Sequence, residues 1–339
     1  MARRRCNRAF RVAAGMLGAT ALAVTALTPA PSRAVTSVAA HSSAAASLSA
    51  ASLSAASLSA PSLGAPSLVA RTRAVGGRPV KSASCSRTLN VVAHEDDDLL
   101  FINPSVSADI AAGRCVVTVF VTAGDSGRPP SYWLRRERGS MAAYAAMSGT
   151  SASWESDTLV LAGHPIVRQR LRGTRITLLF MRLPDAHGSP LRPFGTLPAL
   201  WQGEIPRLRP LGSGGAYTRQ TLVKTLTAAM AVYQPDRIRT LDYAGHYGDG
   251  DHADHHTVGY FTFAAQRSYH AHHRISGYRG YTVAAYPDNL DESAAGRKLD
   301  YFLAYAPYDS KVCQSADACL TNFYGPRFTH SLTTASSVH

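Results

Sequence analysis

The 339-residue sequence has little of what would mark a membrane, fibrous or disordered protein. Its only long apolar run is Val12–Leu27, which is shorter than the about 20 residues that a membrane-spanning helix requires. Charged residues make up 17% of the chain and hydrophobic residues 45%, which is enough for a buried core and excludes a collagen-like or wholly disordered chain.

Several catalytic and binding motifs are also missing. There is no Gly-x-Ser-x-Gly, so a serine hydrolase with a nucleophile elbow is not supported. There is no His-Glu-x-x-His, so a zincin-type peptidase is not supported either. No basic run with interleaved aromatic residues occurs in the part expected to fold, and we therefore expect no nucleic-acid partner.

Residues 1–34 lack acidic residues and carry six of the 35 basic ones, so that 29 basic and 22 acidic residues remain beyond them. A cationic head at Arg3–Arg11 precedes the apolar run, and small residues flank Ala34. This pattern predicts a signal peptide over 1–34 and a secreted protein. A membrane anchor is the alternative, but the run is short and no stop-transfer sequence follows; we expect no stable membrane insertion.

A low-complexity tract follows the signal. Units such as Ala-Ser-Leu-Ser-Ala repeat along Ala46–Ala70, and such small residues bury too little area to offset the entropy of ordering. We interpret residues 35–80 as an Ala/Ser/Leu/Pro linker and residues 81–339 as the folded domain.

Cysteine is scarce. Beyond Cys6 there are four, and an even number in an exported chain suggests two disulfides. Cys85 and Cys115 each precede a strand-like run, so they can pair as Cys85–Cys115 if those strands are parallel neighbours. Cys313–Cys319 would then close a short loop. A zinc site made of these four cysteines is the alternative, although no Cys-x-x-Cys spacing occurs.

Strand-like and helix-like segments alternate in the folded part. The patterns predict strands over 88–93, 115–122, 175–182 and 237–241 and helices over 105–112, 131–147, 217–233, 259–266 and 291–305. Residues 186–215, rich in glycine and proline, predict a long irregular segment. This alternation indicates an α/β layered fold with a mainly parallel sheet, in which ligands bind beyond the carboxyl ends of the strands.

Two clusters of metal-ligating residues follow two of these strands. Ala93–Asp98 contains a histidine and three consecutive aspartates, whose mutual repulsion a cation would relieve. His252–His256 contains imidazoles at positions i and i+3, which project to one side if the segment begins a helix. Two imidazoles and one carboxylate suit zinc and leave a coordination position open for water.

The first cluster reads Ala-His-Glu-Asp-Asp-Asp and resembles the Ala-His-Pro-Asp-Asp-Glu motif of the PIG-L/LmbE-like deacetylases. The second reads His-Ala-Asp-His, with Gly259 beyond it, and resembles that family's His-Pro-Asp-His motif followed by glycine. The likeness covers about residues 87–310. It implies a Rossmann-like sheet with helices on both faces and the zinc-dependent removal of the acetyl group from N-acetylglucosamine units.

By position, the resemblance also implies a role for each site residue. The metal ligands would be His94, Asp97 and His255, with Zn²⁺ or another divalent metal between them. The catalytic residues would be Asp96, as general base, and His252, which protonates the amine or steadies the oxyanion. Asp254 and Asp98 would contact the metal ligands and orient them without binding the metal. Arg136 and Asp185 would contact the sugar substrate.

Three positions depart from the family's motifs. Glu95 and Ala253 stand where the family has proline, and Asp98 stands where it has glutamate. We expect these changes to affect geometry more than chemistry, since proline ligates nothing. Two other functions remain open at this point: a non-catalytic carbohydrate-binding protein with the same fold, and a hydrolase of another amide or ester.

Overall fold

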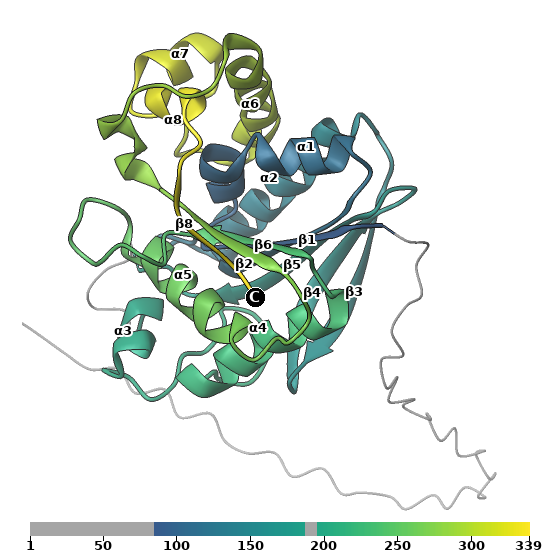
Figure 1. Cartoon of the computed structure of the whole chain (residues 1–339), viewed down its shortest axis with the longest axis vertical. Helices are drawn as coiled ribbons and strands as arrows, with labels where there is room; N and C mark the ends of the chain where they lie inside the picture. Colours follow the sequence, from purple (N-terminus) through teal and green to yellow (C-terminus); the bar gives the residue numbers. More distant parts are fainter. Residues whose placement is uncertain (1–84, 187–194) are drawn as a thin grey trace, which may run out of the picture. The chain divides into compact units, whose positions relative to one another are not determined.

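Runs of β-branched and aliphatic residues form the centre of the sheet. In the computed structural model, which describes residues 85–186 and 195–339, eight strands lie in the order β3-β4-β5-β2-β1-β6-β7-β8 (Figure 1). The strands are β1 (Arg87–Val92), β2 (Cys115–Thr122), β3 (Trp154–Leu161), β4 (His164–Leu171), β5 (Ile176–Leu183), β6 (Arg237–Leu241), β7 (Arg274–Tyr278) and β8 (Thr333–Val338).

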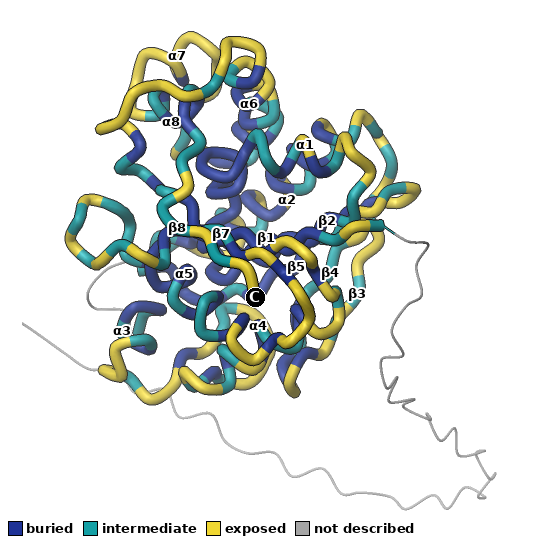
Figure 2. Tube along the Cα trace, viewed as in Figure 1, coloured by how far each residue is buried: buried dark blue, intermediate teal, exposed yellow. Residues whose placement is uncertain are grey.

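The middle five strands, β5 to β7, are parallel, and antiparallel strands complete both edges. The strand order reverses at β1, because β2 pairs with one of its sides and β6 with the other. Such a reversal opens a crevice at the carboxyl ends of the strands. Figure 2 shows β1 and β2 as buried, and this is the fully covered setting in which apolar parallel strands occur.

Helices cover both faces of the sheet, as Figure 1 shows. One face carries α1 (Ser105–Ala111), α2 (Pro130–Ser148) and α6 (Glu292–Tyr305), and the other carries α3 (Leu197–Gln202), α4 (Arg219–Tyr233) and α5 (Ala253–Gln266). The shorter elements are α7 (Ala316–Thr321), α8 (Gly325–Thr329), the π-helix η1 (Asp98–Ile102) and the 3₁₀ helices η2 (Tyr281–Ala285) and η3 (Ala306–Tyr308). The layers are those of an α/β fold.

Side-chain caps fix where several helices begin. Thr218 accepts the backbone N–H of Thr221 at the start of α4, and Asp291 accepts that of Ala294 at the start of α6. The cap of α5 is unusual, since the ring nitrogen of His252 accepts the backbone N–H of Asp254. These bonds satisfy N–H groups that have no partner within the helix.

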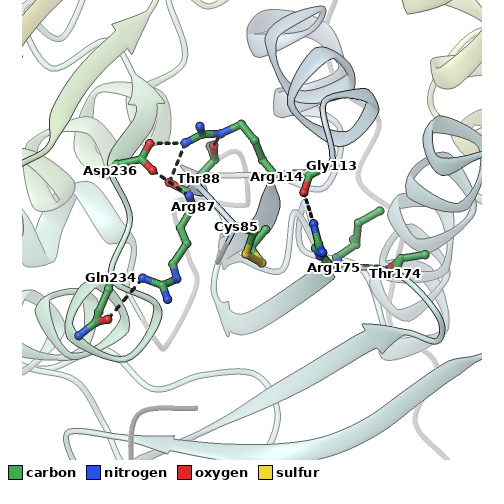
Figure 3. Close-up of a disulfide and its surroundings, with 11 residues drawn as sticks. Cys85, Arg87, Thr88, Gly113, Arg114, Thr174, Arg175, Gln234 and Asp236 are labelled. Atoms are coloured by element: carbon green, nitrogen blue, oxygen red, sulfur yellow. Dashed lines mark hydrogen bonds and ion pairs between the residues drawn. A yellow bond between two sulfur atoms is a disulfide. The ribbon is translucent and has the colours of Figure 1, made fainter. Parts of the chain in front are cut away.

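The two disulfides pair as expected. Cys85 and Cys115 lie at the same end of neighbouring parallel strands, with their Cα atoms 5.8 Å apart, and Cys313 pairs with Cys319. Figure 3 shows the first disulfide among the side chains at this edge of the sheet, where Arg114 forms an ion pair with Asp236. The disulfide thus joins the first residues of the described domain to its second strand.

The strands and helices predicted from the sequence are confirmed to within two residues, with two exceptions. The helix predicted over 259–266 was placed too late, because α5 begins at Ala253. The segment 186–215 is not wholly irregular, because it contains α3. The sequence patterns do not predict the hairpin of β3 and β4, the strand β7 or the edge strand β8.

The sequence interpretations that concern the signal and the linker, 1–34 and 35–80, lie outside the described residues. Within the part of the chain that the structure describes, no helix has the length and hydropathy needed to cross a membrane.

Candidate active site

The candidate site lies where the strand order reverses. The residues after β1 begin at Ala93, and α5 begins after the loop 242–252 that follows β6. A cavity of about 290 Å³ opens there, near the lower end of the roughly 300–1,000 Å³ typical of small-molecule sites. Five of the site residues predicted from the sequence line this cavity: His94, Asp96, Arg136, Asp185 and His252. The two predicted clusters therefore share one cavity.

Asp97 is the centre of the expected ligand set. Its Oδ2 accepts the backbone N–H groups of Ala93 and His94 at 3.0 and 2.7 Å, which fixes the carboxylate directly beyond β1. Its Oδ1 is 3.3 Å from Nδ1 of His94 and 3.1 Å from Nε2 of His255. Behind His255, Nδ1 is 2.8 Å from Oδ1 of Asp251, which orients the ring.

The charges of Asp97 and His255 shift each other's pKa. Burial opposes ionisation of Asp97, but the neighbouring imidazoles outweigh it and hold the pKa of this carboxyl well below its usual range. Burial likewise lowers the pKa of His255, but Asp97 and Asp251 outweigh it and raise the pKa to about 10. A divalent cation between these groups would offset the negative charge of the carboxylates.

The donors suit a divalent metal. Ring nitrogens of His94, His252 and His255 lie within 4.8 Å of one another, and Asp97 adds an oxygen between two of them. Nε2 of His94 is buried without a hydrogen-bond partner among the described residues, although Oδ2 of Asp254 lies 3.4 Å away. Nitrogen and carboxylate donors of this kind bind zinc in catalytic sites.

Asp96 is held by a buried arginine. Its Oδ1 accepts a hydrogen bond from Nη2 of Arg136 at 2.7 Å, and Asp96 lines the cavity. Burial raises the pKa of Asp96 against the opposing effect of the Arg136 guanidinium. The other nitrogens of Arg136 donate to the carbonyl oxygen of Gly124 and to the hydroxyl of Tyr305, and Nε is 2.9 Å from Oδ2 of Asp309. Arg136 therefore fixes one oxygen of Asp96.

His252 presents one nitrogen to the cavity. Its Nδ1 accepts the backbone N–H of Asp254 at 3.2 Å, so the neutral ring carries its proton on Nε2, which is 3.9 Å from Oδ1 of Asp185. Burial and the positive charges of His94 and His255 lower the pKa of His252 to about 3. Asp185 is itself positioned by Ser126, whose backbone N–H and hydroxyl donate to its Oδ2 at 3.3 Å.

Two acidic residues of the first motif are turned away from the expected ligands. Asp98 accepts the backbone N–H of Leu99 and the hydroxyl of Tyr144, which lies on α2, and it contacts no histidine of the site. Burial raises the pKa of Asp98 to about 7, in spite of the Tyr144 hydrogen bond. Glu95 is fully buried 3.5 Å from Nη1 of Arg136, and burial raises its pKa to about 8.

The sequence profile of the PIG-L family, described as GlcNAc-PI de-N-acetylase, matches residues 89–266, which is more than half of the chain. The chain belongs to the PIG-L family. It is therefore a hydrolase of the N-deacetylase class, as the two motifs predict. No match to a curated protein was found.

Several solved structures resemble this one distantly. Teicoplanin deacetylase Orf2, in its zinc-inhibited form, is 14% identical, with 65% of this chain and 84% of that chain covered and a TM-score of 0.40. The N,N'-diacetylchitobiose deacetylase of Pyrococcus horikoshii is 14% identical, with coverages of 76% and 84% and a TM-score of 0.42. The hydratase GalB is 13% identical, with coverages of 67% and 79% and a TM-score of 0.40.

One glycine of the PIG-L motif has a clear packing reason. A Cβ added at Gly259 would lie 2.9 Å from the carbonyl oxygen of Leu241 and 2.9 Å from the backbone nitrogen of Tyr243. Only glycine therefore lets α5 approach the end of β6 this closely. The approach brings His255 within reach of Asp97.

Sequence reasoning missed the residues that come from outside the PIG-L match. Six residues beyond residue 266 line the cavity: Tyr281, Asp309, Lys311, Val312, Phe323 and Tyr324. We call these six residues the C-terminal wall. No motif in the sequence marks them, since their positions depend on how the chain returns over the site after β7. Asp251 could have been found, because it directly precedes the second motif.

Proposed function

We propose that the protein is a secreted, zinc-dependent N-deacetylase that removes the acetyl group from an N-acetylglucosamine-containing glycan, glycolipid or glycoside. One observation carries this proposal: Asp96, His252 and His94 line a single cavity, and His94 contacts the buried Asp97, which in turn contacts the buried His255. The family match supports the class of reaction, and the site supports the roles of the residues.

In the proposed reaction a water attacks the acetyl carbonyl carbon. His94, Asp97 and His255 would hold the metal, and the chemistry that a bound divalent ion supplies is a water of lowered pKa and a polarised carbonyl. Asp96 accepts a proton from the attacking water. Its Oδ1 is engaged by Arg136, so its Oδ2 is the oxygen available to do this.

His252 acts on the opposite side of the carbonyl. Because its Nδ1 accepts the N–H of Asp254, its Nε2 carries a proton that can be donated to the developing oxyanion. Collapse of the tetrahedral intermediate breaks the C–N bond, the nitrogen takes the proton that Asp96 accepted from the water, and acetate and a free amine leave. Asp254, whose Oδ2 lies 3.4 Å from Nε2 of His94, places a negative charge beside that ring.

The proposed location rests on sequence and chemistry together. The cationic and apolar pattern of residues 1–34 is that of a signal peptide, and disulfides persist in oxidising compartments outside the cytosol. A glycan outside the cell is therefore the expected class of substrate.

The test is acetate release from a panel of N-acetylglucosamine mono- and oligosaccharides, with zinc content measured on the same protein. We expect the Asp96→Asn variant to lose at least 100-fold in kcat while it keeps its zinc, since general-base removal typically costs 10²–10⁴-fold. The Asp97→Ala variant should lose the active-site zinc as well.

Asp300→Asn, the same chemical change at an exposed position on α6, serves as the control and should leave both values unchanged. Full activity in Asp96→Asn would contradict the assigned mechanism. Zinc binding with no turnover across the panel would favour a carbohydrate-binding protein, and turnover only of other amides or esters would redirect the substrate assignment.

A further inference from the structure

A second cluster of ligating side chains lies behind the candidate site, and the proposed reaction does not use it. Oxygen or nitrogen atoms of Asp242, Asp249 and His256 all lie within 4.8 Å of one another. Asp242 follows β6 directly, Asp249 lies in the loop that leads to α5, and His256 lies in the first turn of α5. Side chains at neighbouring positions on a helix point about 100° apart, so His256 and His255 contact different residues.

The ring of His256 is held in the orientation of a metal ligand. Its Nδ1 is 3.0 Å from the backbone carbonyl oxygen of Asp242, and because a carbonyl only accepts, Nδ1 carries a proton. Nε2 then faces Oδ1 of Asp249 at 3.0 Å. In the neutral ring this nitrogen bears a lone pair, which a carboxylate oxygen repels and a cation attracts. A backbone carbonyl on the far nitrogen is the usual support of a metal-bound histidine.

The pairing matches that of the neighbouring residue. His255 has Nδ1 2.8 Å from Oδ1 of Asp251 and Nε2 3.1 Å from Oδ1 of Asp97. Each histidine thus has one nitrogen anchored to an oxygen and the other at about the same distance from an aspartate. Of these two histidines, His255 is one of the proposed metal ligands.

Asp242 and Gly245 complete the second cluster. Oδ1 of Asp242 accepts the N–H groups of Ala244 and Gly245 and the hydroxyl of Thr334, and no described residue donates a hydrogen bond to Oδ2. A Cβ at Gly245 would lie 2.5 Å from Cε1 of His256, 2.8 Å from Oδ2 of Asp242 and 2.9 Å from Oδ2 of Asp249. Three potential ligand groups therefore converge beside a residue that has no side chain to fill the space.

We propose that Asp242, Asp249 and His256 bind a second divalent cation, distinct from the one in the active site. One imidazole and two carboxylates suit Zn²⁺ or Mn²⁺ better than Ca²⁺, which takes oxygen ligands. The side chain of Asp249 is 18% exposed, so water can complete the coordination.

This cation would act on the active site through the chain between the two clusters. Asp249 is two residues from Asp251, whose carboxylate accepts the N–H groups of Gly280 and Tyr281 and holds Nδ1 of His255. An ion at Asp249 would fix this segment and, through Asp251, the ring of His255. Asp249 and His256 are positioning residues in this scheme, since neither lines the cavity.

The experiment is zinc stoichiometry on the full chain, freed of metal with a chelator and then titrated with Zn²⁺, with thermal unfolding as a second readout. We expect two equivalents in the wild type, and one each in Asp249→Asn, His256→Gln and Asp97→Asn. The Asp249→Asn/Asp97→Asn double variant should bind none. His246→Gln, an exposed histidine of the same loop, is the matched control and should bind two.

Asp249→Asn keeps the size of a partly exposed side chain and decides the case if His256→Gln does not fold. Wild-type stoichiometry in both variants would overturn the proposal and leave His256 and Asp249 as an ion pair. A single wild-type equivalent that only Asp97→Asn removes would do the same. If only Asp249→Asn removes it, the second site stands and the metal ligands of the proposed function are wrong.

Discussion

Arg136 connects the general-base candidate to a part of the chain far away in sequence. Its guanidinium, almost fully buried, donates to Asp96 and to Tyr305 and pairs with Asp309. The resemblance implied contact with sugar for this arginine. Since its three nitrogens already have protein partners, we propose that Arg136 instead positions Asp96. A buried cation keeps a carboxylate in place only if its other partners are in place too.

Asp109 gives a residue-scale prediction for stability. This buried carboxylate on α1 accepts hydrogen bonds from Thr88, Arg237 and Arg239. Burial opposes its ionisation, but the hydrogen bond and charge of Arg239 outweigh that effect and hold the pKa of Asp109 below its usual value. The stabilisation is therefore complete above the unfolded-state pKa of about 3.9 and is lost as the pH falls through the lower folded-state pKa.

We expect Asp109→Asn to lower the free energy of unfolding at pH 7 by about 1.5–3 kcal/mol, the range for hydrogen bonds to charged groups. The gap between wild type and variant should narrow as the pH falls below about 4, in urea unfolding measured from pH 7 down to pH 2. Asp300→Asn provides the comparison at an exposed site. A gap that stays constant over this range would show that the charge of Asp109 contributes nothing.

At the scale of elements, the C-terminal wall combines buried and exposed side chains at the cavity. Phe323 is 58% exposed although it lines the cavity, and one face of its ring lies against the guanidinium of Arg327 at 3.9 Å. Lys311, also on the wall, is exposed. An exposed aromatic ring at a cavity rim is suited to pack against a second sugar ring.

We therefore predict that Phe323→Ala raises KM about four- to twelvefold for N-acetylated disaccharides and longer chains, since about half of the roughly 1.5–3 kcal/mol of a buried phenylalanine is lost. KM for the N-acetylglucosamine monosaccharide and kcat for both should stay the same. Leu320→Ala, an equally exposed apolar residue on α7 that does not line the cavity, is the control. An equal rise for the monosaccharide would place Phe323 at the first sugar instead.

The elements show which parts of the fold local sequence can reveal. The strands β1 and β2 are largely apolar runs that are buried almost throughout, so composition alone marks them. The strands β3 and β4 are polar and lie at the edge, as Glu155 and Arg170 illustrate, and their pairing with each other stabilises them more than burial does. The helix α5 was predicted to begin late, because its capping residue is a histidine.

The same contrast holds for the site. The motifs give Asp96 and Asp97 because these residues follow β1 directly, at a strand end where parallel sheets gather side chains, and they give His255 because it lies in the first turn of α5. Arg136, Tyr305 and Asp309 are brought together by the packing of α2 against α6 and η3, which no local pattern encodes. Asp98 illustrates the reverse case, because a π-helix turns its carboxylate toward Tyr144 on α2.

At the scale of the whole molecule, the two disulfides divide stability and recognition between them. Cys85–Cys115 closes a loop of 30 residues that contains β1 and the first motif. Cys313–Cys319 closes one of 6 residues that lies between Lys311 and Phe323 of the C-terminal wall. Loop-closure entropy assigns about 3.7 kcal/mol to the first and about 2.2 kcal/mol to the second.

The double variant Cys85→Ser/Cys115→Ser should therefore lose more of the free energy of unfolding than Cys313→Ser/Cys319→Ser, measured in urea without reductant. The effect on KM should have the opposite order, with the larger change in Cys313→Ser/Cys319→Ser. Loss of Cys313–Cys319 frees Lys311 and Phe323 from each other, so KM for oligosaccharides should rise while the monosaccharide KM holds. The two pairs are each other's controls: if both lower stability equally and neither changes KM, the short loop has no part in the site, and the wall depends on the packing of Tyr281 and Tyr324 alone.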